Sequence, residues 1–136
     1  MATDTQTSRT VVEKFLERLG RQDADGIQEL FSEDIDWYVP GRLPGTGRRT
    51  RQEEVAPYFT TLWSLFVPGQ SKVVLERFIV DGGDVVLLAV FTHTVVSTGK
   101  EFTQPVAMHL AVEDDRIVRM HLYEDTLTVA EAFNAG

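Results

Sequence analysis

The chain of 136 residues contains 13 basic and 21 acidic residues, a net charge of −8, and 43% hydrophobic residues, which is typical of one folded domain with a real core. The acidic charge argues against binding to nucleic acid or to an anionic membrane surface, and the lack of cysteine excludes disulfides and thiolate chemistry. No apolar run reaches the roughly 20 residues that span a bilayer, and the polar first residues contain no recognisable secretory signal, so we expect a cytoplasmic protein.

The N-terminal half predicts helices. We expect a flexible polar tail over residues 1–7 and a single domain over residues 8–136. A capping box at Thr10 and Glu13 predicts the start of the first helix, which carries an apolar stripe of Val11, Val12, Phe15, Leu16 and Leu19. A short second helix is expected after Asp23, and a short strand over residues 34–39.

A loop and a third helix follow. Residues 41–50 contain three glycines, one proline and three arginines, which is typical of a loop. A second capping box, from Thr50 to Glu53, predicts a third helix. Its apolar face carries Val55, Tyr58, Phe59, Leu62 and Phe66. The arginines at 48, 49 and 51 are interpreted as a solvated helix start.

The C-terminal half changes to the period of strands. Residues 72–80, 85–96, 102–112 and 117–123 are rich in β-branched and aromatic residues, and short turns join them, which indicates a four-strand antiparallel meander. Thr128 and Glu131 predict a last short helix. The whole pattern predicts an α+β fold, with three N-terminal helices packed on a curved, mainly antiparallel sheet.

The strand over residues 85–96 is apolar on both of its faces. A sheet covered on one face only alternates apolar and polar residues. The helices account for one face, so we expect a second subunit to cover the other. The sequence therefore predicts a homodimer through the sheet.

Residues 11–41, with a helix, the break at Asp23–Gly26 and the strand before Pro40, resemble the opening of bacterial ketosteroid isomerases and SnoaL-like polyketide cyclases. Residues 114–133, DDRIVRMHLYEDTLTVAEAF, resemble the last strand and terminal helix of the SnoaL-like group. The chain thus resembles the nuclear transport factor 2-like superfamily, over almost its whole length. The resemblance implies a cone-shaped fold around an apolar pocket, although such a fold hosts many functions.

The resemblance also argues against one activity. The first-helix tyrosine, the aspartate base and the protonated aspartic acid of ketosteroid isomerases fall on Phe15, Val39 and Met108 of this chain. None of these side chains can donate or remove a proton in that mechanism. Steroid isomerisation by the usual residues is therefore not expected.

The residues that face the pocket are implied by the resemblance and by the alternation of strand side chains. His93 is the first candidate for catalysis. An imidazole among Phe91, Val95 and Trp37 is expected to titrate near neutrality, as suits a general base or acid. The alternative is a structural histidine that hydrogen-bonds a neighbouring strand or water.

Glu124 is the second catalytic candidate, because a carboxylate in an apolar cavity has a raised pKa. Asp125 competes with it, since a register error of one residue would exchange their faces. The alternatives are that Glu124 is an ordinary surface glutamate and that Asp125 caps the last helix.

The remaining candidates bind substrate. Trp37 is expected to stack on a ring-shaped ligand, and Arg42 to pair with an acidic or enolate oxygen. The other residues assigned to the pocket walls are Phe15, Val39, Phe91, Gln104, Met108, Met120 and Leu122. No metal site is expected, because two of the three histidines, His109 and His121, should face away from the pocket.

These residues predict a protein that binds a small apolar or cyclic organic ligand. We expect a cofactor-independent enzyme that performs isomerisation, cyclisation, hydration or dehydration on a carbonyl compound. Two alternatives stay open: a ligand-binding protein without catalysis, and a protein-interaction module of the same fold.

Overall fold

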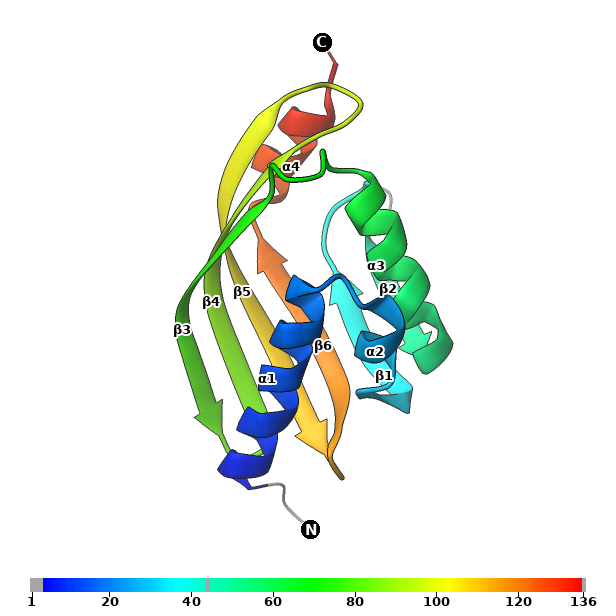
Figure 1. Cartoon of the computed structure of the whole chain (residues 1–136), viewed down its shortest axis with the longest axis vertical. Helices are drawn as coiled ribbons and strands as arrows, with labels where there is room; N and C mark the ends of the chain where they lie inside the picture. The colour runs from blue at the N-terminus through cyan, green and yellow to red at the C-terminus, as the bar shows by residue number, and fades with distance from the viewer. Residues whose placement is uncertain (1–3, 44, 136) are drawn as a thin grey trace.

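The computed structural model describes residues 4–43 and 45–135. It has the expected α+β architecture, with helices on the concave face of a curved sheet (Figure 1). The helices are α1 (Thr5–Gly20), α2 (Ala24–Gln28), a 3-10 helix η1 (Gln52–Glu54), α3 (Val55–Ser64) and α4 (Thr126–Phe133). The strands are β1 (Phe31–Val39), β2 (Gly47–Arg51), β3 (Lys72–Asp81), β4 (Asp84–Thr94), β5 (Glu101–Glu113) and β6 (Arg116–Glu124).

The sheet has six strands in the order β2-β1-β6-β5-β4-β3. The predicted meander of β3 to β6 is confirmed, because each of these strands pairs antiparallel with the next. The first strand, β1, returns to lie parallel to the last one, β6. This pairing brings the N-terminal half of the chain beside β6, so both halves contribute to the concave face.

The first helix begins earlier than expected. The Asp4 carboxylate accepts a hydrogen bond from the Thr7 backbone N–H at 2.7 Å, and α1 starts at Thr5. The Thr10 hydroxyl lies inside the helix and donates to the Gln6 carbonyl, so the predicted capping box at Thr10 is wrong. The predicted tail is therefore helical from Thr5 onward, and its residues 1–3 lie outside the described residues.

Part of the predicted loop is a strand. Strand β2 pairs antiparallel with β1, with Arg48 opposite Tyr38 and Arg49 opposite Trp37. Backbone hydrogen bonds to the neighbouring strand outweigh the loop-like composition here. The predicted box from Thr50 to Glu53 is also wrong, because the Glu54 carboxylate accepts from the Thr50 and Arg51 backbone N–H groups, at 3.1 Å each.

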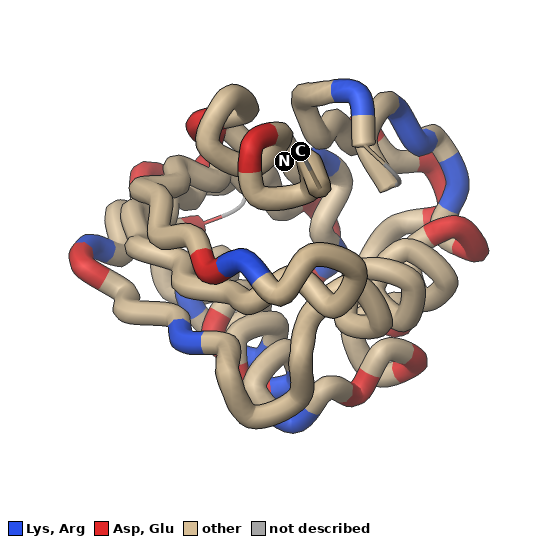
Figure 2. The backbone as a smooth tube through the Cα atoms, turned by 90° about the horizontal axis from the view of Figure 1, so that it is seen from above, with Lys and Arg blue, Asp and Glu red and all other residues tan. Residues whose placement is uncertain are grey.

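The main core lies between the helices and the concave face. Phe15 of α1 and Ile27 of α2 are fully buried against the inward residues of β4 to β6. Burial of such side chains contributes about 1.5–3 kcal/mol each. Figure 2 shows acidic and basic positions of both signs around the periphery of the fold. No described helix is long and apolar enough to cross a membrane.

Candidate active site

A cavity opens between the helices and the concave face of the sheet. Its larger part, the deep chamber, has a volume of about 230 Å³ and is mostly apolar. The deep chamber is lined by Phe15, Leu16, Leu19, Gly20, Tyr58, Phe59, Leu62, Trp63, Phe66, Ser71, Val73, Phe91, His93, Met108, Met120 and Leu122. An apolar, concave space of this kind suits a small organic ligand.

A second part, the polar chamber, adjoins the deep chamber and has a volume of about 80 Å³. The two chambers share Tyr58, Leu62, Phe66, Phe91, His93 and Leu122. The polar chamber adds Gln104 and Glu124, and helix α4 closes it with Val129 and Phe133. The polar side chains of the cavity are thus gathered mainly at one end.

The strand register explains which residues reach the cavity. Gln104 of β5 lies opposite Phe91 of β4, and Glu124 of β6 lies opposite Val106 of β5. Side chains opposite each other in a sheet share a face. Phe91, Gln104 and Glu124 accordingly lie on the concave face and line the cavity, while His109, His121 and Tyr123 lie on the other face.

His93 lies at the junction of the two chambers. Its ring stacks on Phe66, with 4.1 Å between the ring centroids and 10° between the planes, and its Nδ1 lies 2.8 Å from the Ser71 hydroxyl. Phe91 and Phe102 pack around the same ring. Burial in this aromatic surrounding lowers the pKa of His93 to about 4. The expected titration near neutrality is wrong, because burial deprives the charged imidazolium of its hydration.

Glu124 is the carboxylate of the cavity. Its Oε2 accepts a hydrogen bond from Gln104 Nε2 at 2.9 Å. The Gln104 Oε1 accepts in turn from the backbone N–H of Asp125 at 3.0 Å, which fixes the orientation of the amide. Burial raises the pKa of Glu124, and the Gln104 hydrogen bond opposes that rise. The carboxyl is therefore poised to exchange a proton closer to neutrality than an exposed glutamate.

Asp125 faces away from the cavity and caps α4. Its carboxylate accepts hydrogen bonds from the Thr128 backbone N–H at 3.0 Å and from the Thr128 hydroxyl at 2.7 Å. These hydrogen bonds lower the pKa of Asp125. Of the two acidic residues at this strand end, Glu124 faces the cavity and Asp125 caps the helix terminus.

Tyr58 is a cavity residue to which the sequence interpretation gave no chemical role. It lines both chambers from α3, and the Arg49 guanidinium lies over its ring, 4.6 Å from the centroid. Burial and the nearby Glu124 carboxylate raise the pKa of Tyr58, so its hydroxyl stays protonated at neutral pH. The sequence did offer a signal for this role, because Tyr58 carries a polar hydroxyl within the otherwise apolar face of its helix.

Two predicted ligand contacts lie elsewhere. Trp37 is fully buried in the core, against Phe31, Tyr58 and Phe59, because α3 covers the indole. The expected stacking of Trp37 on a ligand is therefore wrong. Arg42 lies in the loop after β1, at a smaller pocket of about 70 Å³ on whose wall Glu124 also lies.

The other predicted wall residues surround the two chambers. Phe15, Met108 and Met120 line the deep chamber, and Val39 and Gln104 line the polar chamber. Phe91 and Leu122 line both chambers. Among residues 4–43 and 45–135, no group of three or more histidine and carboxylate side chains is placed to hold a metal ion.

Comparison with solved structures identifies the fold. An NTF2-like protein from Burkholderia xenovorans superposes with a TM-score of 0.83 at 25% identity, covering 97% of this chain and 99% of that one. TerC, co-crystallised with polyporic acid, gives a TM-score of 0.79 at 17% identity, with 93% and 97% covered. A putative ketosteroid isomerase from Kribbella flavida gives 0.66 at 18% identity, with 90% and 81% covered.

No curated protein sequence matches the chain. A family model does match it, that of the SnoaL-like domain, over residues 12–120. This match includes most of the cavity walls, and the fold of the solved neighbours agrees with it. The chain belongs to the SnoaL-like domain family, within the nuclear transport factor 2-like superfamily.

Proposed function

We propose that this protein is a cofactor-independent enzyme that moves a proton on an apolar, cyclic carbonyl compound, with Glu124 as the general base. The observation that carries the proposal is the position of the Glu124 carboxyl, hydrogen-bonded by Gln104 at the polar end of an otherwise apolar cavity. A base in such a place can remove a weakly acidic proton next to a carbonyl group. The same carboxyl can return that proton to another carbon, or assist a cyclisation or dehydration.

The oxygen of the substrate needs hydrogen-bond donors as charge develops on it. Tyr58 can supply one, because its raised pKa keeps the hydroxyl protonated. His93 can supply another in the tautomer with Nε2 protonated, in which Nδ1 accepts from the Ser71 hydroxyl. The lowered pKa of His93 keeps it neutral at pH 7, so it acts as a donor rather than as the expected base.

The apolar deep chamber would hold the body of the ligand, with Phe15, Met108 and Met120 as part of its wall. The carbonyl end would lie near Tyr58 and Glu124. TerC, which shares the fold, was co-crystallised with an organic compound, polyporic acid, and this supports an organic ligand here.

A second candidate is a binding protein that retains the cavity without catalysis. It is favoured by the apolar residues Phe15, Val39 and Met108 at positions that carry the chemistry in ketosteroid isomerases. Such a protein would bind the same ligands but leave their protons in place.

The test is proton exchange on 2-tetralone in D2O, followed by NMR. The wild type should accelerate exchange at the carbon next to the carbonyl, and Glu124→Gln should lower that acceleration by about 10²-fold or more. Glu113→Gln, an exposed glutamate at the end of β5, serves as the matched control and should leave the rate unchanged. Tyr58→Phe should lower the rate by about 10-fold or more.

Binding is measured separately, from the shifts of the Met108 and Met120 methyl signals as 2-tetralone is added. Shifts without accelerated exchange in the wild type would favour the binding protein over the enzyme. Accelerated exchange that survives in Glu124→Gln would remove Glu124 from the proposed role.

A further inference from the structure

A third and narrower space adjoins the deep chamber, between α1 and the edge strand β3. We call it the side groove, and its volume is about 30 Å³. Both spaces are lined by Leu16, Leu19, Val73, Phe91 and Met108. Every side chain in the wall of the side groove is apolar, so these side chains offer a ligand neither a hydrogen-bond donor nor a charge.

The three spaces follow one another along β4. His93 lines the polar and deep chambers, and Phe91 lines all three spaces. Ala89 and Leu87 line the side groove alone. At the usual rise of about 3.4 Å per residue, His93 and Leu87 lie about 20 Å apart along the strand. The cavity is therefore elongated, with Glu124 at its polar end and the side groove at the opposite, apolar end.

The course of α1 explains why this end stays open. The Ser8 hydroxyl donates to the Gly82 carbonyl at 2.6 Å, and the Gly82 N–H donates to the Thr5 hydroxyl at 3.1 Å. The Arg9 guanidinium lies over the Phe78 ring of β3, 4.9 Å from its centroid. These contacts hold the start of α1 against β3, and Figure 1 shows the helix running away from β3 toward β6. The side groove lies between the second half of α1 and β3.

The outer edge of the side groove exposes apolar side chains. Val73 and Leu75 of β3 lie opposite Phe91 and Ala89 of β4, so they share the concave face with them. Val73 is 51% exposed and Leu75 is 44% exposed. Apolar surface that is left in water beside an apolar cavity gains free energy when a ligand covers it.

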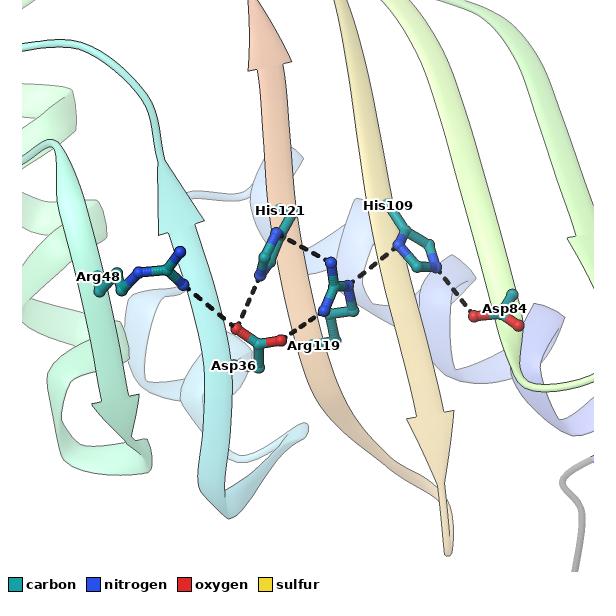
Figure 3. Close-up of polar contacts among 6 residues, drawn as sticks. All are labelled: Asp36, Arg48, Asp84, His109, Arg119 and His121. Atoms are coloured by element: carbon teal, nitrogen blue, oxygen red, sulfur yellow. Dashed lines mark hydrogen bonds and ion pairs between the residues drawn. The ribbon is translucent and has the colours of Figure 1, made fainter.

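The outer face of the sheet, away from the helices, has a different character. A row of polar side chains crosses five of its strands and is joined by hydrogen bonds and ion pairs within the chain (Figure 3). At its centre, the Arg119 guanidinium donates to His109 Nδ1 and to His121 Nδ1, both at 3.1 Å. These charged groups lie on the face opposite to the side groove, so an uncharged chain can enter the groove without burying them.

The width of the side groove limits what can occupy it. One buried water needs about 10–15 Å³ of such volume, so about 30 Å³ admits about two groups of this size in a row. A second ring is too wide for this space, whereas consecutive methylene groups fit. A longer chain can continue over Val73 and Leu75 toward the solvent.

We propose that the ligand carries an unbranched alkyl chain at the end opposite its carbonyl group, and that this chain lies in the side groove between α1 and β3. This position of the chain rests on the proposed function, which puts the carbonyl end near Tyr58 and Glu124. The ring then fills the deep chamber, and its far end points to the side groove. Each methylene group that the groove buries should tighten binding by about fourfold.

The test is the binding of cyclohexanone, 4-ethylcyclohexanone and 4-butylcyclohexanone, in which the chain lies opposite the carbonyl. The shifts of the Met108 and Met120 methyl signals give each dissociation constant. For the wild type, this constant should fall about 10-fold or more from cyclohexanone to the ethyl compound. The butyl compound should bind at least as tightly as the ethyl compound.

The ratio of these constants within each variant is the readout, so that a general change in the protein does not affect it. Leu75→Glu should lose most of the gain, because it places a carboxylate beside the chain. Leu127→Glu is the matched control, because Leu127 is a leucine on α4 that is 68% exposed. This variant should keep the full gain.

Alkyl compounds that bind the wild type no more tightly than cyclohexanone would overturn the proposal, and so would a failure of all three compounds to bind. A Leu75→Glu variant that folds and keeps the full gain would overturn it as well. Should Leu75→Glu fail to fold, the Leu75 methyl signals of the wild type give the answer. They should shift with 4-butylcyclohexanone but not with cyclohexanone, and equal shifts with both would contradict the position of the chain.

These experiments measure binding and need no turnover, so they separate the side groove from the proposed reaction. A gain with chain length in a protein that does not accelerate proton exchange would support the side groove and argue against the enzyme. Accelerated exchange on 2-tetralone without any gain would support the enzyme and overturn the side groove.

Discussion

The two faces of the sheet use the same residue type in opposite ways. On the concave face, His93 contacts a hydroxyl and three aromatic rings, and burial lowers its pKa to about 4. On the outer face, His109 and His121 each accept from Arg119 and each contact a carboxylate. A histidine between ionic partners is a structural element, whereas a histidine held neutral in an apolar cavity is available to a ligand.

The carboxylates show the same contrast. Burial raises the pKa of Glu124 on the concave face, while the hydrogen bond from His121 lowers the pKa of Asp36 on the outer face. Oppositely charged neighbours stabilise the ionised form of a carboxyl and lower its pKa. A buried carboxyl without such neighbours has a raised pKa and exchanges its proton more readily near neutral pH. The uncompensated groups surround the cavity, which is where proton transfer is proposed.

The largest expected effect compares two leucines on opposite faces. Leu110 is fully buried in the core on the concave face, whereas Leu88 is only half-buried on the outer face. Leu110→Ala should lower the free energy of unfolding by about 3–4 kcal/mol, and Leu88→Ala by about 1 kcal/mol. Urea unfolding of the wild type and both variants checks this. Equal losses would mean that the outer face is as tightly packed as the core.

The next effect sharpens the comparison of the histidines. Since the pKa of His93 is lowered from 6.5 to about 4 in the folded state, the unfolded chain binds more protons in this range. The stability that the neutral His93 contributes to the fold is therefore fully present above pH 6.5 and is lost as the pH falls toward 4. The loss should amount to about 1–2 kcal/mol, allowing for the partial exposure of the ring.

His93→Gln should remove this pH dependence, and His109→Gln should retain it. Urea unfolding curves at several pH values between about 4.5 and 7.5 measure the difference between each variant and the wild type. If the free energies of unfolding of the wild type and His93→Gln differ by the same amount at every pH, the pKa of His93 is not lowered by burial.

The smallest effect concerns the two acidic residues at the end of β6. Asp125→Ala removes the N-cap of α4 and should cost about 1 kcal/mol of stability. It should leave proton exchange on 2-tetralone nearly unchanged, because Asp125 lies outside the cavity. Asp125→Asn retains a capping oxygen and should recover most of the loss. A strong loss of exchange in Asp125→Asn would indicate that Asp125, rather than Glu124, acts on the substrate.

The strands show how far local pattern can lead. The two-residue period of β4, β5 and β6, together with the resemblance that set the inward face, predicted that Gln104 faces inward and His109 outward, while the choice between Glu124 and Asp125 stayed open. Strand β2 was missed, because its arginine-rich stretch has no apolar alternation and becomes a strand through pairing with β1. The start of α1 was missed because the Asp4 cap lies in a stretch without an apolar stripe.

The sequence by itself determined the α+β fold through local periodicity and turn chemistry. The family and the inward faces of β4, β5 and β6 were implied by the resemblance of residues 11–41 and 114–133 to known members. The tertiary structure decided the surroundings of each functional group. Phe66 stacks on His93 from a segment after α3, Tyr58 reaches the cavity from α3, and Trp37 is covered by the same helix. Burial and electrostatic surroundings depend on residues far apart in the chain, so the pKa values and the walls of the cavity emerge only when the helices pack on the sheet.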